Sequence, residues 1–135
     1  FIIQDQRQLP GGNMKRTIVA AMLLFSGAAF SDHVDVIEFT LNEGCSKEQY
    51  LEIVNDFREE WGSKNGYETE ILFPLQSNNM TSIFWVGRSA NAAAFGAAYD
   101  KWATELGDSD SAAAKLSERF GECSTSIGRR GYLTD

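Results

Sequence analysis

The sequence predicts an α+β domain in which a four-stranded antiparallel sheet carries helices on one face. Segments of strand and helix periodicity follow in the order strand, helix, strand, strand, helix, strand, with the second helical segment split in two. Pro74 lacks a backbone donor near the end of the second strand, which favours an edge position. Cys45 and Cys123 flank the first and fourth strands, which this layout makes neighbours. The expected sheet therefore has the first and third strands in the middle, with the fourth antiparallel beside the first.

Four segments carry the strand signal. The first covers 34–41 and alternates, with Ile37 and Phe39 on one face. The third covers 81–88, and its centre is apolar on both faces, which is typical of a strand buried on both sides. The two remaining strands are expected at 67–75 and 124–133.

Capping residues and glycines set the expected helix boundaries. Ser46 and Gln49 have the spacing of a capping box, and the helix that they begin is expected to stop at Gly62 and Asn65-Gly66. The second helical segment is expected to begin at Asn91. It is split in two, and its second part is expected to begin at Asp108 or Asp110 and to end at Gly121.

A secretory leader precedes the predicted domain. Met14, Lys15 and Arg16 form a basic head, 17–25 is an apolar run, and Ala29 and Ser31 stand at −3 and −1 of a cleavage site. We interpret 1–13 as an upstream translated segment, 14–31 as a signal peptide and 32–135 as a single domain. The alternative is a cytoplasmic tail followed by a membrane anchor. A membrane-spanning helix needs about 20 apolar residues, and the run at 17–25 is too short for this. The expected location is periplasmic or secreted, with no membrane contact after cleavage.

The charge balance argues against nucleic acid as a partner. The full chain has a net charge of −7, and residues 32–135 alone carry nine basic and eighteen acidic residues. Such a surface repels phosphate backbones, and the largest basic cluster is the pair Arg129 and Arg130.

The two cysteines are expected to form a disulfide. In an oxidising compartment, Cys45 and Cys123 are most often paired, and closing a loop of this length stabilises a domain by roughly 4 kcal/mol. A catalytic thiol or a metal pair is the rival interpretation, but no histidine or further cysteine lies nearby in the sequence.

The order of elements and the two-faced sheet resemble the ferredoxin-like βαββαβ fold of the dimeric α+β barrel proteins. This group includes antibiotic-biosynthesis-monooxygenase-like, EthD-like and NIPSNAP-like domains. The resemblance covers nearly all of 32–133 and no short motif carries it, so no catalytic residue is transferred. It implies a homodimer in which two sheets pack face to face, with ligands between sheet and helices or inside the barrel.

Two charged residues are candidates for ligand binding. Glu38 shares a strand face with apolar residues, so it could point into the barrel and act as a base; alternatively it lies at a wet rim or pairs with Arg88, Arg129 or Arg130. Arg88 ends the central strand and could anchor an anionic ligand, or it is a surface charge.

Aromatic residues are the other candidates. Tyr67, Trp85, Tyr99 and Trp102 could line an apolar pocket, although such stripes are more often plain core. His33, the single histidine, lies near the expected new N-terminus and is interpreted as a disordered terminal residue rather than a haem ligand. No metal-ligand spacing is present, so neither metal nor cofactor is predicted.

Three functions remain open at this point. The first is a small-molecule-binding dimeric barrel with cofactor-free monooxygenase-like activity on an apolar or aromatic compound. The second is a non-catalytic exported binding or structural module, and the third is a haem protein. An enclosed pocket would favour the first, whereas a filled barrel would argue against it.

Overall fold

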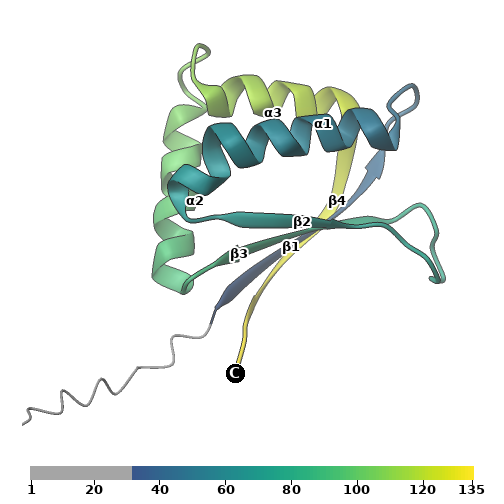
Figure 1. Cartoon of the computed structure of the whole chain (residues 1–135), viewed down its shortest axis with the longest axis horizontal. Coiled ribbons are helices and arrows are strands. Elements are labelled where there is room, and N and C mark those ends of the chain that lie inside the picture. Colours follow the sequence, from purple (N-terminus) through teal and green to yellow (C-terminus); the bar gives the residue numbers. More distant parts are fainter. Residues whose placement is uncertain (1–31) are drawn as a thin grey trace, which may run out of the picture.

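A computed structural model describes residues 32–135, which form one antiparallel sheet covered by helices (Figure 1). The strand order β2-β3-β1-β4 confirms the predicted sheet. The leader expected at 14–31 lies outside the described residues. The elements in chain order are β1 (His33–Leu41), α1 (Lys47–Phe57), η1 (Arg58–Gly62), η2 (Ser63–Asn65), β2 (Glu68–Leu72), β3 (Ile83–Ser89), α2 (Ala92–Glu105), α3 (Ala112–Cys123) and β4 (Ser124–Leu133).

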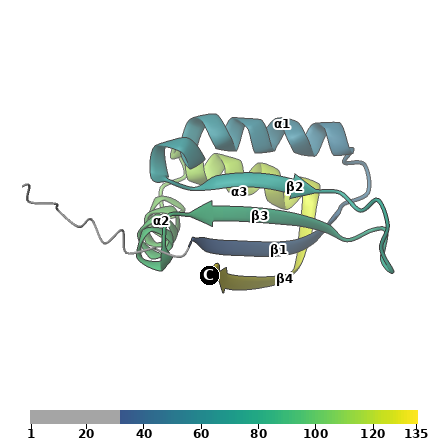
Figure 2. The same ribbon diagram turned by 60° about the horizontal axis from the view of Figure 1, so that its bottom comes forward.

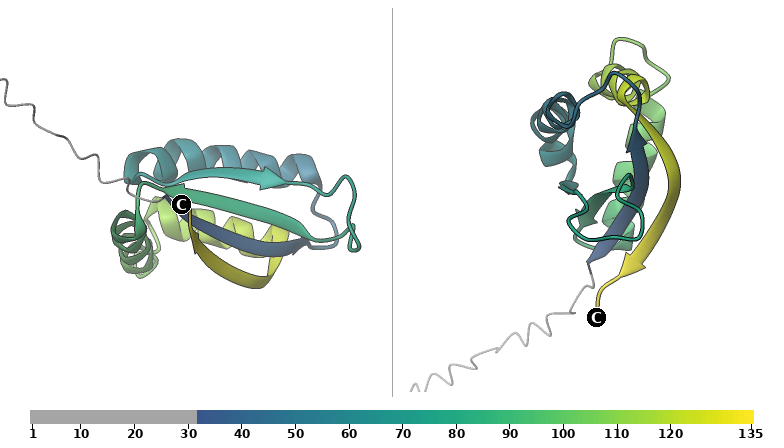
Figure 3. Two further views of the ribbon diagram at one scale, coloured as in Figure 1. Left: turned by 90° about the horizontal axis from the view of Figure 1, so that it is seen from below. Right: turned by 90° about the vertical axis from the view of Figure 1, so that its right-hand side faces the viewer.

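All three α-helices lie on one side of the sheet. Helices α1 and α3 run side by side along it, and α2 stands across one end (Figures 1 and 2). Strand β4 leaves the end of α3 and curves along β1 to the C-terminus (Figure 3). Along the described chain no helix has both the length and the apolar character needed to cross a bilayer.

The two faces of the sheet are different. On β1 and β3 the odd-numbered residues face the helices, and Ile37 lies opposite Trp85 in the core. The even-numbered residues face away from the helices, where Val36 pairs with Val86 and Leu72 of β2 lies beside Phe84. The second face therefore keeps an apolar centre that no helix covers.

A β-bulge changes the register of β4. Glu38 pairs with Gly128, but the next residue of β1, Phe39, pairs with Ser126, so Ile127 is one extra residue in β4. Because side chains alternate along a strand, the extra residue exchanges the two faces of β4. After the bulge, Arg129 lies opposite Ile37 and faces the helices.

Three predicted boundaries are wrong. Strand β2 ends at Leu72 rather than at 75, because its pairing with β3 stops there, and Pro74 lies beyond it. Helix α3 is capped by Ser111 rather than by an aspartate, and it continues past Gly121. The helical segment from Ser46, by contrast, has the predicted capping box, continues through the turns η1 and η2, and ends at Asn65 with Gly66 in the left-handed conformation, as predicted.

Asn42 explains why α3 continues past its glycine. Its side-chain amide donates to the carbonyl oxygens of Gly121 and Glu122 at 3.4 and 3.1 Å. Its backbone N–H donates to the carbonyl oxygen of Cys123 at 2.9 Å. These bonds satisfy the free carbonyl groups at the helix end without a left-handed residue. The predicted disulfide from Cys45 to Cys123 closes the same junction, with a Cα–Cα distance of 5.2 Å.

Candidate functional site

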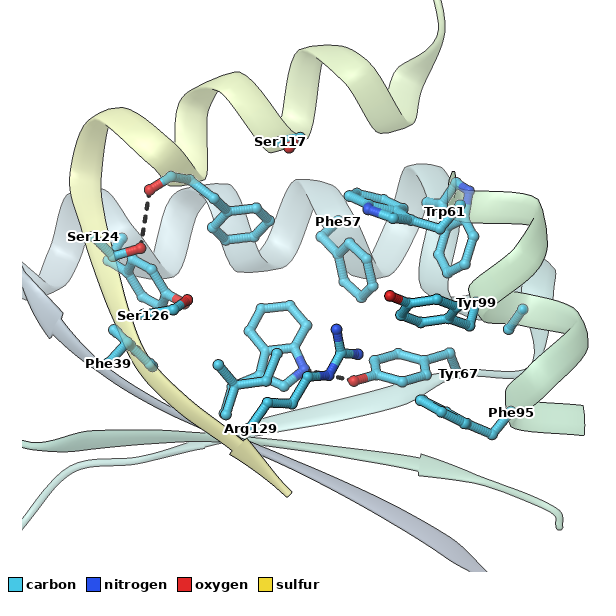
Figure 4. Close-up of a pocket in the computed structure, with 16 residues that line it drawn as sticks. Phe39, Phe57, Trp61, Tyr67, Phe95, Tyr99, Ser117, Ser124, Ser126 and Arg129 are labelled. Atoms are coloured by element: carbon cyan, nitrogen blue, oxygen red, sulfur yellow. Dashed lines mark hydrogen bonds between the residues drawn. The ribbon is translucent and has the colours of Figure 1, made fainter. Parts of the chain in front are cut away.

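A cavity of about 350 Å³ lies between the sheet and the three α-helices (Figure 4). Sixteen residues line it, and they come from β1, β3 and β4, from the three α-helices, from η1, and from Tyr67 directly before β2. Ten of the sixteen are aromatic: Phe39, Tyr50, Phe57, Trp61, Tyr67, Trp85, Phe95, Tyr99, Trp102 and Phe120. All three tryptophans of the chain are in this set. The cavity thus replaces part of what would otherwise be a filled hydrophobic core.

A polar network crosses the sheet side of this cavity. Asp35 is only 1% exposed, and its carboxylate accepts hydrogen bonds from Tyr67 Oη at 2.8 Å and from Arg129 Nε and Nη2 at 2.8 and 2.6 Å. Trp85 Nε1 donates to Tyr67 Oη at 2.9 Å. Both Asp35 oxygens are therefore satisfied, as a buried carboxylate requires.

Gly87 makes room for Tyr67 in this network. A Cβ atom at position 87 would overlap with the Tyr67 ring and hydroxyl group. Gly66 has a φ of +64°, so it takes the left-handed conformation that turns the chain from η2 toward Tyr67. These two glycines allow the phenol to lie flat over a central strand and reach Asp35.

The network fixes the protonation of two of its members. Burial, reinforced by the Asp35 carboxylate, raises the pKa of Tyr67 far above its ordinary value, so the phenol stays protonated and donates. The hydrogen bonds to Asp35 raise the pKa of Arg129, so the guanidinium stays charged. The Asp35 carboxylate is thus engaged by an ion pair and three hydrogen bonds.

A second, more open hollow of about 260 Å³ adjoins the cavity and shares Phe95, Tyr99 and Arg129 with it. The Arg129 guanidinium carbon lies 5.3 Å from the Tyr99 ring centroid and 5.9 Å from that of Phe95. His33 also lines the hollow and stacks on Phe95, with ring centroids 4.0 Å apart. His33 is therefore an ordered residue of β1, and its interpretation as a disordered terminal residue is wrong.

The six candidate residues separate into two groups, and Trp102 belongs to the group that lines the cavity. Tyr67, Trp85 and Tyr99 line the cavity. Glu38 and Arg88 lie on the opposite face of the sheet, where Glu38 Oε1 accepts from Ser82 Oγ at 2.7 Å and Arg88 is 3.8 Å from Glu70. The alternative pairing of Glu38 with an arginine is not found among the described residues. In a single chain, the two groups do not share a site.

Two residues of the network were not candidates from the sequence. Asp35 shares the alternation of Ile37 and Phe39, so its burial had a detectable signal: a carboxylate on an apolar strand face. Arg129 had none, because the bulge at Ile127 reverses the face that simple alternation predicts. Within residues 32–135, no group of three or more histidine, cysteine or acidic side chains is placed to hold a metal ion.

The comparisons with known proteins place the fold. No protein-family model matches the chain, and no curated protein sequence does either. Among solved structures, the chain is similar to SnoaB, a cofactor-independent oxygenase from Streptomyces nogalater, with a TM-score of 0.53 and 10% identity over 78% of this chain and 94% of SnoaB.

Two further solved structures match with lower scores. A hydroxynitrile lyase from Passiflora edulis has a TM-score of 0.48 and 15% identity, over 76% of this chain and 94% of the lyase. A dimeric protein of ferredoxin-like fold from Bacteroides fragilis has a TM-score of 0.42 and 13% identity, over 76% of this chain and 95% of that one.

The topology and the similarity to SnoaB agree on the fold. The chain has the ferredoxin-like fold that the dimeric α+β barrel proteins share, as its sequence resemblance implies. At 10% identity the similarity defines the fold and assigns no activity.

Proposed function

We propose that this protein binds a small apolar or aromatic molecule in the cavity between its sheet and helices. The observation that carries the proposal is a cavity of about 350 Å³ whose wall is mostly aromatic. A volume of roughly 300–1,000 Å³ with an apolar lining and a few polar groups is typical of small-molecule sites. The network of Asp35, Tyr67 and Arg129 supplies those polar groups.

Tryptophan fluorescence tests this binding directly, since all three tryptophans line the cavity. Adding a neutral two-ring probe such as 2-naphthamide should quench the emission in a saturable way. Ala98 is buried in the cavity wall, so Ala98→Leu should occupy the space and abolish saturation. Ala97→Leu, on the exposed side of α2, is the matched control and should bind as the wild type does. Equal quenching of Ala98→Leu would argue against the cavity as the site.

The proposal includes a homodimer formed through the second face of the sheet. Val36 and Phe84 on this face are half-buried, Leu72 is 48% exposed, and no helix covers them. A second copy packed on this face would bury an apolar surface that is costly to leave in water. Size-exclusion chromatography with light scattering should give a dimer. Val36→Lys should convert the dimer to a monomer. The control Ala93→Lys, at an exposed position of α2, should leave it a dimer. A wild-type protein that is monomeric at micromolar concentration would refute the dimer.

The proposal also places the protein outside the cytoplasm. The leader pattern at 14–31 and the disulfide between Cys45 and Cys123 support export, since disulfides persist in oxidising compartments. N-terminal sequencing of the protein from the periplasmic or extracellular fraction should begin at Asp32. Full-length protein in the cytoplasmic fraction would contradict export.

Cofactor-free oxygenase activity is the finer part of the proposal. The shared fold with SnoaB, whose name gives it as a cofactor-independent oxygenase, supports this part. The engagement of Asp35 by three hydrogen bonds favours the alternative, a non-catalytic binding module, because the cavity then lacks a free carboxylate base. An oxygen electrode separates the two: ligand-dependent oxygen consumption supports the oxygenase, and saturable binding without consumption supports the module.

A further inference from the structure

We infer that the molecule bound in this cavity is an aromatic carboxylate, whose ring system lies among the aromatic side chains and whose carboxylate meets Arg129 at the mouth. The inference rests on the proposed binding function and narrows its ligand to one chemical class. Four features of the described residues support it: the unused donors of Arg129, the fixed position of its guanidinium, the hydroxyl group of Tyr99 and the local distribution of charge.

Arg129 keeps donors available after it has bound Asp35. A guanidinium carries five N–H groups in a planar fork, and only Nε and Nη2 donate to the Asp35 carboxylate. Among residues 32–135, Nη1 has no hydrogen-bond partner, and the guanidinium points into the cavity (Figure 4). The remaining edge of the fork matches the two oxygens of a carboxylate.

The guanidinium is held in place before any ligand arrives. Two hydrogen bonds fix it to Asp35, which is itself buried, and the rings of Tyr99 and Phe95 flank it. The side chain is nevertheless 45% exposed, so a ligand entering from the mouth can reach it. A donor group fixed in advance loses little side-chain entropy on binding, which favours affinity.

Tyr99 offers a second donor beside Arg129. Its hydroxyl group points toward the centre of the cavity (Figure 4) and has no hydrogen-bond partner within the described chain. The same ring flanks the Arg129 guanidinium. An oxyanion in front of Arg129 can therefore accept from Tyr99 as well.

The local charge favours an anion, although the protein is acidic overall. Asp35 is the one carboxylate among the residues that line the cavity and the adjoining hollow, and Arg129 already neutralises it. Arg130 also lines the hollow, so the remaining charge at the mouth is positive. An anionic ligand meets no unpaired carboxylate here, whereas a cationic ligand would meet the exposed edge of Arg129.

Calorimetric titration with 2-naphthoate and 2-naphthamide tests this inference, because the two probes share a ring system and differ in charge. The carboxylate should bind at least about tenfold more tightly than the amide at low salt, and added salt should reduce the difference. Equal affinities would overturn the inference and leave the proposed binding function intact. Failure of both probes to bind would overturn both.

Paired variants locate the carboxylate. Asp35→Asn with Arg129→Gln replaces the ion pair by two neutral amides, so no buried charge is left unpaired and the fold is kept. This double variant should lose the preference for 2-naphthoate and still bind 2-naphthamide. Lys115→Gln, which removes one positive charge from the exposed side of α3, is the control and should keep the preference. A double variant that keeps the full preference would overturn the assignment to Arg129.

Discussion

Breaking the disulfide should remove a large part of the stability of this domain. Cys45 and Cys123 are separated by 78 residues, so the bond restricts most of the unfolded chain. In the chain-entropy model a loop of this length is worth about 4 kcal/mol at 25 °C. A domain of this size has a total stability of about 5–15 kcal/mol, so the loss is a substantial fraction of it.

Urea unfolding measures this loss. With a slope of about 2 kcal/mol per molar urea, Cys45→Ala with Cys123→Ala should lower the midpoint by about 2 M, and reductant should lower that of the wild type equally. Reductant should leave the double variant unchanged, which controls for other effects of the reagent. A wild-type midpoint that moves by less than about 0.5 M on reduction would refute the reasoning. It would mean that the hydrogen bonds of Asn42 already hold the junction between α3 and β4.

Three further changes have defined outcomes. Asn42→Ala should cost about 1–2 kcal/mol in urea unfolding, because its side chain bonds two helix carbonyl oxygens and Thr125; no loss would show that water replaces these bonds. Gly87→Ala should destabilise the fold by about 1–3 kcal/mol or more, because the added methyl group would overlap with Tyr67. Gly96→Ala, in open space on α2, should stabilise it by about 0.5–1 kcal/mol. A Gly87→Ala variant more stable than Gly96→Ala would contradict this packing. The free energy of unfolding should fall as the pH rises above about 10. Burial raises the pKa values of Tyr50 and Tyr67, so the folded chain keeps protons that the unfolded chain releases. An absorbance titration in which Tyr50 and Tyr67 form tyrosinate while the protein is still folded would contradict this prediction.

The fold was predictable because its signals are local. Alternation and one continuous apolar run identified the strands, the capping box at Ser46 began the first helix, and the cysteine pair agreed with the strand order. The helix ends were harder, because they depend on contacts from distant residues. Gly121 is a sound local stop signal, but Asn42, 79 residues earlier, supplies the partners that let the helix continue.

The candidate site was only partly predictable for a related reason. The aromatic residues could be proposed from spacing alone, and Tyr67, Trp85 and Tyr99 do line one cavity. The ion pair joins residues 94 positions apart, and one inserted residue in β4 decides which of two adjacent arginines faces the core. Without the bulge at Ile127, alternation from Ser126 would place Arg130 inward and Arg129 outward.

The cavity and the disulfide belong to one physical argument. A domain of about one hundred residues has little surplus stability, and interiors of folded proteins are normally close-packed. Leaving about 350 Å³ open among ten aromatic side chains forgoes packing contacts that a filled core would make. The bond between Cys45 and Cys123 stabilises the same domain without filling the space, because neither cysteine lines the cavity. A core that stays open while a disulfide elsewhere in it supplies stability supports the proposed binding function over a purely structural role.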